Sequence, residues 1–102
     1  HFYRDIDSNP LGPTLPSDMF AGFSKMDILS MRGCHLEDIE NGTFRAMKNL
    51  TDLDLSFNKL AHIHKGTVEG LTDQLTNLYL DGNELETISD GTFKQFKILQ
   101  RW

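Results

Sequence analysis

The sequence predicts an α/β-type solenoid, in which the chain coils once every 24 or 25 residues and stacks its coils side by side. Two observations support this prediction. The apolar pattern L-x-x-L-x-L-x-x-[N/C]-x-L recurs along most of the 102 residues, with its Asn or Cys at Asn9, Cys34, Asn58 and Asn83, so the spacings are 25, 24 and 25. The L-x-L core of each unit alternates apolar with other residues, which indicates a short strand with one buried face.

One repeat array covers the whole chain, residues 1–102. It is divided as follows: a degenerate repeat at 1–24, full repeats at 25–48, 49–73 and 74–98, and the start of a further repeat at 99–102. The degenerate copy departs from the pattern because Arg4 stands where an inward Leu is expected. We expect the array to be a piece of a longer protein, incomplete at both ends.

Each part of the repeat has a predicted structure. Successive coils place their L-x-L segments side by side, so these segments should pair into a parallel sheet. The Asn after each strand can donate to and accept from backbone groups of the turn that no other group satisfies. We therefore expect a structural ladder at Asn9, Cys34, Asn58 and Asn83, with Cys34 as a buried small residue rather than a reactive thiol. The return path lacks helical periodicity over ten residues, which predicts turns or 3₁₀ segments.

Composition excludes several classes of function. The 15 acidic and 10 basic residues give a net charge of −5, which argues against nucleic-acid binding. No run of 18 apolar residues is present, so the sequence predicts no membrane span within this segment. The single Cys excludes an internal disulfide and a Cys-rich zinc site. Because the chain contains no G-x-S-x-G, H-E-x-x-H, P-loop or G-x-G-x-x-G motif, we predict no enzymatic activity, no cofactor and no metal site.

The repeat signature, with the I-x-x-G-T segment that follows it in each full unit, resembles that of extracellular leucine-rich-repeat proteins. The similar subclass has a Phe in the return path, a position that Phe44 and Phe93 hold here, with Phe20 in the degenerate copy. Toll-like receptors, chaoptin-like adhesion proteins and Slit-like guidance proteins belong to it. The resemblance implies a right-handed coil whose sheet forms the concave face, protein binding on that face, and an extracellular or cell-surface location reached through the secretory pathway.

The outward positions of the three predicted strands form the candidate binding face. They carry four acidic residues and one basic residue, net −3, together with apolar and aromatic side chains. Such a surface suits a protein partner with a basic patch. The alternative is an ordinary solvated strand surface. The partner-binding candidates are Ile28, Arg32, Asp52, Asp54, Phe57, Asn77, Tyr79 and Asp81.

Two N-glycosylation sequons occur, Asn41-Gly42-Thr43 and Asn49-Leu50-Thr51, so we predict glycosylation at Asn41 and Asn49. Thr43 also belongs to the Gly-Thr turn of the repeat, which is an alternative reason for the first sequon. The predicted function is the protein-binding section of an extracellular ectodomain used in cell-surface adhesion or recognition. The alternatives are the ligand-binding ectodomain of a Toll-like signalling receptor and a soluble secreted matrix protein. An intracellular scaffold is the more remote alternative.

Overall fold

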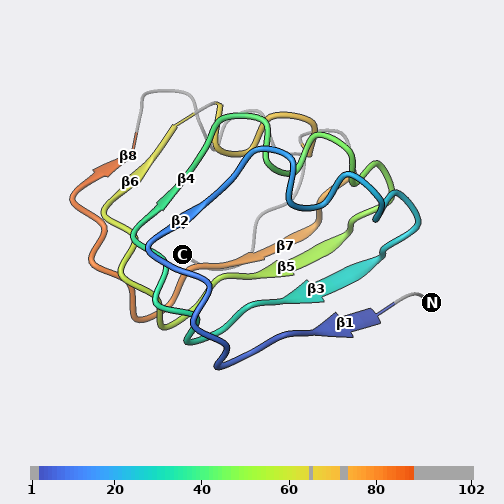
Figure 1. Ribbon diagram of the computed structural model, residues 1–102. Helices are drawn as coiled ribbons and strands as arrows, with labels where there is room; N and C mark the ends of the chain where they lie inside the picture. The colour runs from blue at the N-terminus through green and yellow to red at the C-terminus, as the bar shows by residue number, and fades with distance from the viewer. Residues whose placement is uncertain (1–2, 65, 72–73, 89–102) are drawn as a thin grey trace.

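The computed structural model describes residues 3–64, 66–71 and 74–88, with the side chains of 87 and 88 excepted, and shows stacked coils (Figure 1). Each coil contributes one strand to a four-stranded parallel sheet in the order β1-β3-β5-β7. These strands are β1 (Tyr3–Asp5), β3 (Ile28–Ser30), β5 (Asp52–Asp54) and β7 (Asn77–Tyr79). The predicted solenoid and its parallel sheet are confirmed.

The register of the sheet places equivalent residues of successive coils next to one another. Leu53 of β5 pairs with Leu29 on one side and Leu78 on the other, and all three side chains point into the core. Arg4 pairs with Leu29, so it occupies the inward position of the first coil, as the sequence predicts. Because side chains alternate along a strand, the residues on either side of this central position face outward.

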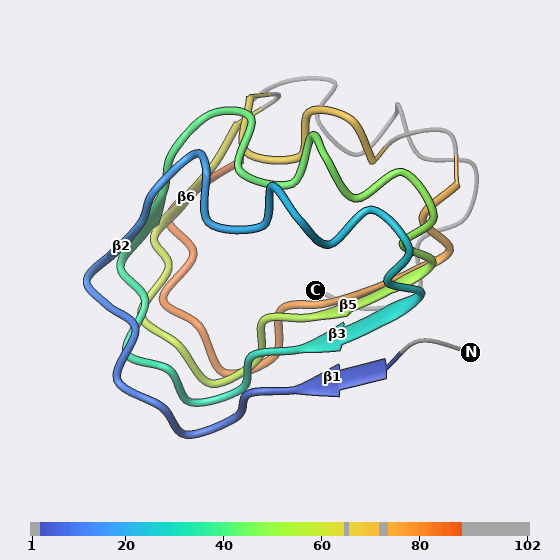
Figure 2. The same cartoon turned by 45° about the vertical axis from the view of Figure 1, so that its right-hand side comes forward.

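The far side of each coil is built from short strands and turns (Figure 2). Two small parallel sheets lie there: β2 (Thr14–Leu15) pairs with β4 (Asp38–Ile39), and β6 (His62–Ile63) pairs with β8 (Thr87–Ile88). The turns close with hydrogen bonds between residues three apart, which is the 3₁₀ pattern. The described residues contain no helix, so the predicted return path of turns is confirmed.

A single apolar core fills the space between the sheet and the return path. Aromatic rings join the first two coils, because Phe20 and Phe44 stack with centroids 5.7 Å apart and planes 12° apart. Val68 takes the equivalent place in the third coil and is buried. Phe93, the predicted counterpart in the fourth coil, lies outside the described residues, as does the predicted further repeat at 99–102. The core therefore fixes each coil on its neighbour and holds the sheet face in place.

Candidate functional site

Asn58 connects the backbones of two successive coils from a buried position. Its Oδ1 accepts hydrogen bonds from the backbone N–H groups of Cys34 (2.8 Å) and Leu36 (3.1 Å) in the preceding coil. Its Nδ2 donates to the carbonyls of Met31 (3.0 Å) and Leu55 (2.9 Å), with a longer contact to a third carbonyl. One side chain thus satisfies backbone groups of two coils, which is why an amide is placed at the end of the strand.

Burial and hydrogen bonding differ among the other ladder positions. Asn83 repeats the arrangement one coil later, with its Oδ1 accepting from Leu60 N (3.0 Å). Asn9, in the first coil, is exposed and donates to Ile6 O within its own turn. Cys34 is fully buried and its Sγ lies 3.2 Å from Ile6 O. Burial raises the pKa of the Cys34 thiol, so it stays protonated at neutral pH and is a poor nucleophile.

The outward side chains of the sheet line a shallow hollow of about 340 Å³ that crosses β1, β3, β5 and β7. We call this the sheet-face hollow. It brings together five of the eight predicted binding residues: Ile28, Arg32, Asp52, Asp54 and Tyr79. Residues far apart in the sequence meet here because the register stacks equivalent positions of each coil.

Three residues of the first coil also line the sheet-face hollow and were missed by the sequence analysis: Tyr3, Asp5 and Asp7. The repeat period could have located them. Subtracting 25 from Ile28, Ser30 and Arg32 gives these three positions, and the strand register pairs the first two as that shift requires. Arg4, at an inward position, hides the strand pattern of the first coil.

The sheet-face hollow is acidic. Four aspartates, at 5, 7, 52 and 54, face one arginine, so its charge at neutral pH is −3. Arg32 is only loosely paired, with its Nε 3.7 Å from Asp54 Oδ2 and about half of its side chain exposed. A surface pair of this kind contributes at most about 1 kcal/mol. The excess negative charge therefore remains available to a cationic partner.

Asp7 ties the first coil to the second. Its Oδ1 accepts hydrogen bonds from Ser30 Oγ (2.6 Å) and from Arg32 N (2.7 Å). Partial burial acts to raise the pKa of Asp7, but these hydrogen bonds outweigh it and hold the pKa below its usual range. The ionised carboxylate is consequently the form that stabilises the contact between the coils.

This pKa shift predicts a pH-dependent stability. A carboxyl group whose pKa is lowered on folding stabilises the protein above its unfolded pKa of about 3.9 and loses that effect as the pH falls through the folded pKa. Wild type should therefore be more stable than Asp7→Asn at pH 7, and the difference should shrink below about pH 4. Urea unfolding of both proteins between pH 2 and 7 measures it. A difference that stays constant over this range would contradict the assignment.

The remaining predicted binding residues lie outside the lining of the sheet-face hollow. Phe57 is 55% exposed and its ring lies 5.1 Å from the guanidinium carbon of Arg32. Asn77 is half-buried and donates to Asp52 Oδ2 at 2.9 Å. Asp81 is half-buried, and its backbone carbonyl accepts from Phe57 N. All three lie near the hollow through these contacts, although they do not form its walls.

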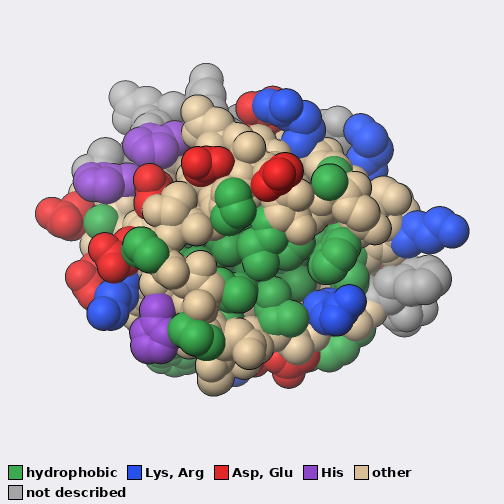
Figure 3. All heavy atoms as spheres, in the orientation of Figure 1, with side chains coloured by type: hydrophobic (Ala, Val, Ile, Leu, Met, Phe, Trp, Pro, Cys, Tyr) green, Lys and Arg blue, Asp and Glu red, His purple; other side chains and the backbone are tan. Residues whose placement is uncertain are grey.

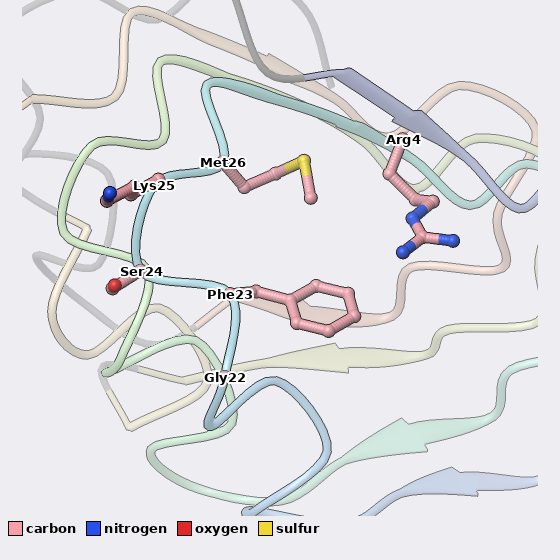
Figure 4. A pocket seen from close by; sticks show the side chains of 6 residues that line it. All are labelled: Arg4, Gly22, Phe23, Ser24, Lys25 and Met26. Carbon is pink, nitrogen blue, oxygen red and sulfur yellow. The ribbon is translucent and has the colours of Figure 1, made fainter.

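The N-terminal end of the stack exposes apolar side chains within the ring of the first coil (Figure 3). Arg4 stands over Phe23 at 5.4 Å and separates two hollows of about 330 and 340 Å³. The first hollow is shown in Figure 4 and includes Lys25 and Met26. Arg4 is itself exposed, as expected for a guanidinium that requires polar surroundings.

Both predicted glycosylation sites are exposed. Asn41 lies beside Gly66 of the next coil, where an added Cβ would stand 2.4 Å from the Asn41 Cγ. Thr43 is buried and its Oγ1 donates to Glu40 O at 2.8 Å, so this residue also has a role in the turn. Asn49 lies on the turn that leads into β5. Either asparagine is accessible for modification in the folded chain.

Models of the leucine-rich-repeat family match residues 24–73 and 74–96. The chain belongs to this family. It is 37% identical to human lumican over 82 residues, which are 79% of this chain and 23% of lumican. It is 41% identical to rabbit (Oryctolagus cuniculus) lumican over 64 residues, 63% of this chain and 31% of that protein.

A further relative is the probable glycoprotein hormone G-protein coupled receptor of Anthopleura elegantissima. The two are 40% identical over 81 residues, 79% of this chain and 8% of the receptor. The chain thus spans less than a third of the length of each of these curated relatives. They support the resemblance to extracellular leucine-rich-repeat proteins.

Two further findings concern the described residues alone. Among them, no helix is both long enough and apolar enough to cross a membrane. The same part of the chain holds no group of three or more His, Cys, Asp or Glu side chains placed to hold a metal ion.

Proposed function

We propose that this repeat array binds another protein outside the cell, through the sheet face. The main support for the proposal is the sheet-face hollow, where the strand register brings together aromatic and acidic side chains from successive coils. Tyrosine and phenylalanine are enriched in protein interfaces because they bury a large area with little loss of side-chain freedom. The hollow is shallow and open, so it suits a protein surface better than an enclosed small molecule.

The charge of this face indicates the kind of partner. With net −3 in the sheet-face hollow and −5 for the chain, electrostatic attraction favours a partner with a basic patch. A binding role rather than an enzymatic one is in keeping with the family and its lumican relatives.

Cell-surface adhesion or recognition is the wider role that we infer from the repeat signature. The similarity to lumican favours a soluble secreted matrix protein as the second candidate. The receptor from Anthopleura elegantissima favours the ligand-binding ectodomain of a signalling receptor as a third. An extracellular location is common to all three.

A charge reversal combined with removal of an aromatic ring tests the sheet face. The double change Asp54→Arg with Tyr79→Ala alters two outward, half-buried positions that sit next to each other in the register. We expect at least tenfold weaker binding to partners identified for the wild-type protein in a screen of secreted and cell-surface proteins, since interface aromatics each contribute about 1–2 kcal/mol or more.

Lys48→Ala is the control, because Lys48 is exposed on the turn before β5 and is not among the residues that line the sheet-face hollow. Circular dichroism should show that both variants keep the wild-type fold. Unchanged affinity in the folded double variant would place the binding surface elsewhere on the molecule.

N-linked glycans at Asn41 and Asn49 are part of the same proposal, since they require passage through the secretory pathway. Protein secreted from a eukaryotic host should lose mass on treatment with an N-glycosidase. Asn41→Gln and Asn49→Gln should each remove one glycan from the total. A mass unaffected by the enzyme would contradict the glycosylation proposal and weaken the extracellular assignment.

A further inference from the structure

Phe57 is a large apolar side chain that is held at the surface by an unusual backbone conformation. Its φ is +59°, in the left-handed region that bulky residues rarely adopt. The residue before the ladder position has positive φ in every coil, and the counterparts of Phe57 are Ser8, Gly33 and Gly82. Small residues suit this turn, so a phenylalanine here carries a conformational cost in its backbone.

Neighbouring coils hold the ring of Phe57 in place. The guanidinium of Arg32, in the preceding coil, lies 5.1 Å from the ring centroid. Gly82, in the following coil, leaves the space that the ring fills, because a Cβ there would stand 2.4 Å from Phe57 Cδ1. The ring is therefore 55% exposed and lies between Arg32 of one neighbouring coil and Gly82 of the other. An exposed aromatic ring that is already ordered loses little entropy when a partner covers it.

The surface beside Phe57 is continuous with the sheet-face hollow. A second depression of about 270 Å³ is lined by Asp7, Ser8, Arg32, Gly33 and Phe57. It shares Asp7 and Arg32 with the sheet-face hollow. Among the described residues, the large hydrophobic side chains that are exposed are Phe57 and Tyr3, at 55% and 57%. Tyr3 thus lines the sheet-face hollow and Phe57 lines the adjoining depression, and the two depressions together carry an excess of negative charge.

We propose that Phe57 anchors an extended segment of a partner protein, whose apolar side chain packs on the ring while a neighbouring Lys or Arg enters the sheet-face hollow. This inference rests on the proposed binding function of the sheet. Charge complementarity selects the basic residue, because the hollow carries four aspartates and one arginine. Phe57 belongs to the third coil and Asp7 to the first, and coils stack at the strand spacing of about 4.8 Å, so the two positions are about 10 Å apart, a span of about three extended residues. The segment accordingly carries its apolar and basic side chains within about three positions of each other.

A binding role and a purely structural role for Phe57 predict opposite effects of one substitution on the thermal midpoint. Phe57→Gly introduces the residue that two neighbouring coils already carry at this position, and it relieves the left-handed conformation. If the ring serves binding, Phe57→Gly should keep or raise the thermal midpoint while weakening binding. If the ring serves folding, the midpoint should fall.

The test uses two capped nine-residue peptides built from glycine and serine. One carries a phenylalanine with a lysine three positions on, and the other has glutamate in place of the lysine. Titration of the isotope-labelled chain, followed by NMR, should show shifts of the Asp7, Arg32 and Phe57 amides with the lysine peptide. Binding should be at least tenfold weaker with the glutamate peptide and with Phe57→Gly, whereas Lys48→Ala should bind as wild type does.

Equal binding by wild type and Phe57→Gly, a lowered midpoint in Phe57→Gly, or no shifts with millimolar lysine peptide would each overturn this inference. Failure of the proposed binding function would give a different result from failure of the Phe57 inference. If the sheet face does not bind, Asp54→Arg with Tyr79→Ala would leave the affinity for whole protein partners unchanged. If only the role of Phe57 is wrong, that double variant still loses its partner while Phe57→Gly retains it.

Discussion

Asn58→Ala should lower the free energy of unfolding by about 4 kcal/mol, because it leaves several buried backbone groups unsatisfied at about 1–3 kcal/mol each. The Asn58 side chain serves the N–H groups of Cys34 and Leu36 and the carbonyls of Met31 and Leu55. It is 5% exposed, so water cannot readily replace these bonds. A loss of this size is a large part of the total stability of a small domain, which is about 5–15 kcal/mol.

Asn9→Ala is the matched control, since Asn9 holds the same position of the repeat but is exposed. Its Nδ2 bonds lie within its own turn, to Ile6 O and Asp7 O. Water can take over these bonds, so the expected loss is below about 1 kcal/mol. Chemical denaturation of both variants measures the contrast. Equal losses at the two sites would mean that burial of the amide does not determine its contribution.

The sequence was sufficient to predict the parallel sheet for a physical reason. A coil that repeats every 24 or 25 residues must satisfy the same backbone groups in every turn, so the residue that does this recurs with the same spacing. The inward leucines of the strands recur for the same reason, since each coil buries its apolar face only against the next. The spacing of the sequence repeat therefore predicts the fold directly.

The candidate binding face was only partly predictable. Outward positions of the full repeats followed from the strand pattern, and five of the eight predicted binding residues line the sheet-face hollow. The contribution of the first coil was hidden by Arg4, which breaks the apolar pattern of the strand. The hydrogen bonds of Asp7 to Ser30 and Arg32 join residues 23 and 25 positions apart, so only the three-dimensional register reveals them.

The conformation of Phe57 lay beyond sequence reasoning for a different reason. Nothing in the apolar pattern marks a position with positive φ unless glycine occupies it, and here the four coils carry Ser8, Gly33, Phe57 and Gly82. Two glycines at the same position of the repeat were the available signal. A bulky residue among them shows that the turn geometry is imposed by the stacked coils and not by local preference.

The aromatic contact between the first two coils leads to the second large expected effect. Phe44→Ala should cost about 4 kcal/mol, the usual range for a fully buried phenylalanine being about 3–5 kcal/mol. Phe44 is 0% exposed and stacks on Phe20 with a centroid distance of 5.7 Å. Removing its ring leaves a cavity and deprives Phe20 of its stacking partner. Phe44→Leu, which keeps most of the apolar volume, should cost less and serves as the control.

The effect of Phe44→Ala should be local as well as large, because the lost contact joins the first coil to the second. The amide of Ile6, which donates to Ser30 O across β1 and β3, should lose more hydrogen-exchange protection than the amide of Leu55, which donates to Tyr79 O across β5 and β7. Native-state hydrogen exchange measures both amides in one experiment. An equal loss at both would show that the coils unfold as a single cooperative unit, and the first coil would then not depend on the Phe20–Phe44 contact in particular.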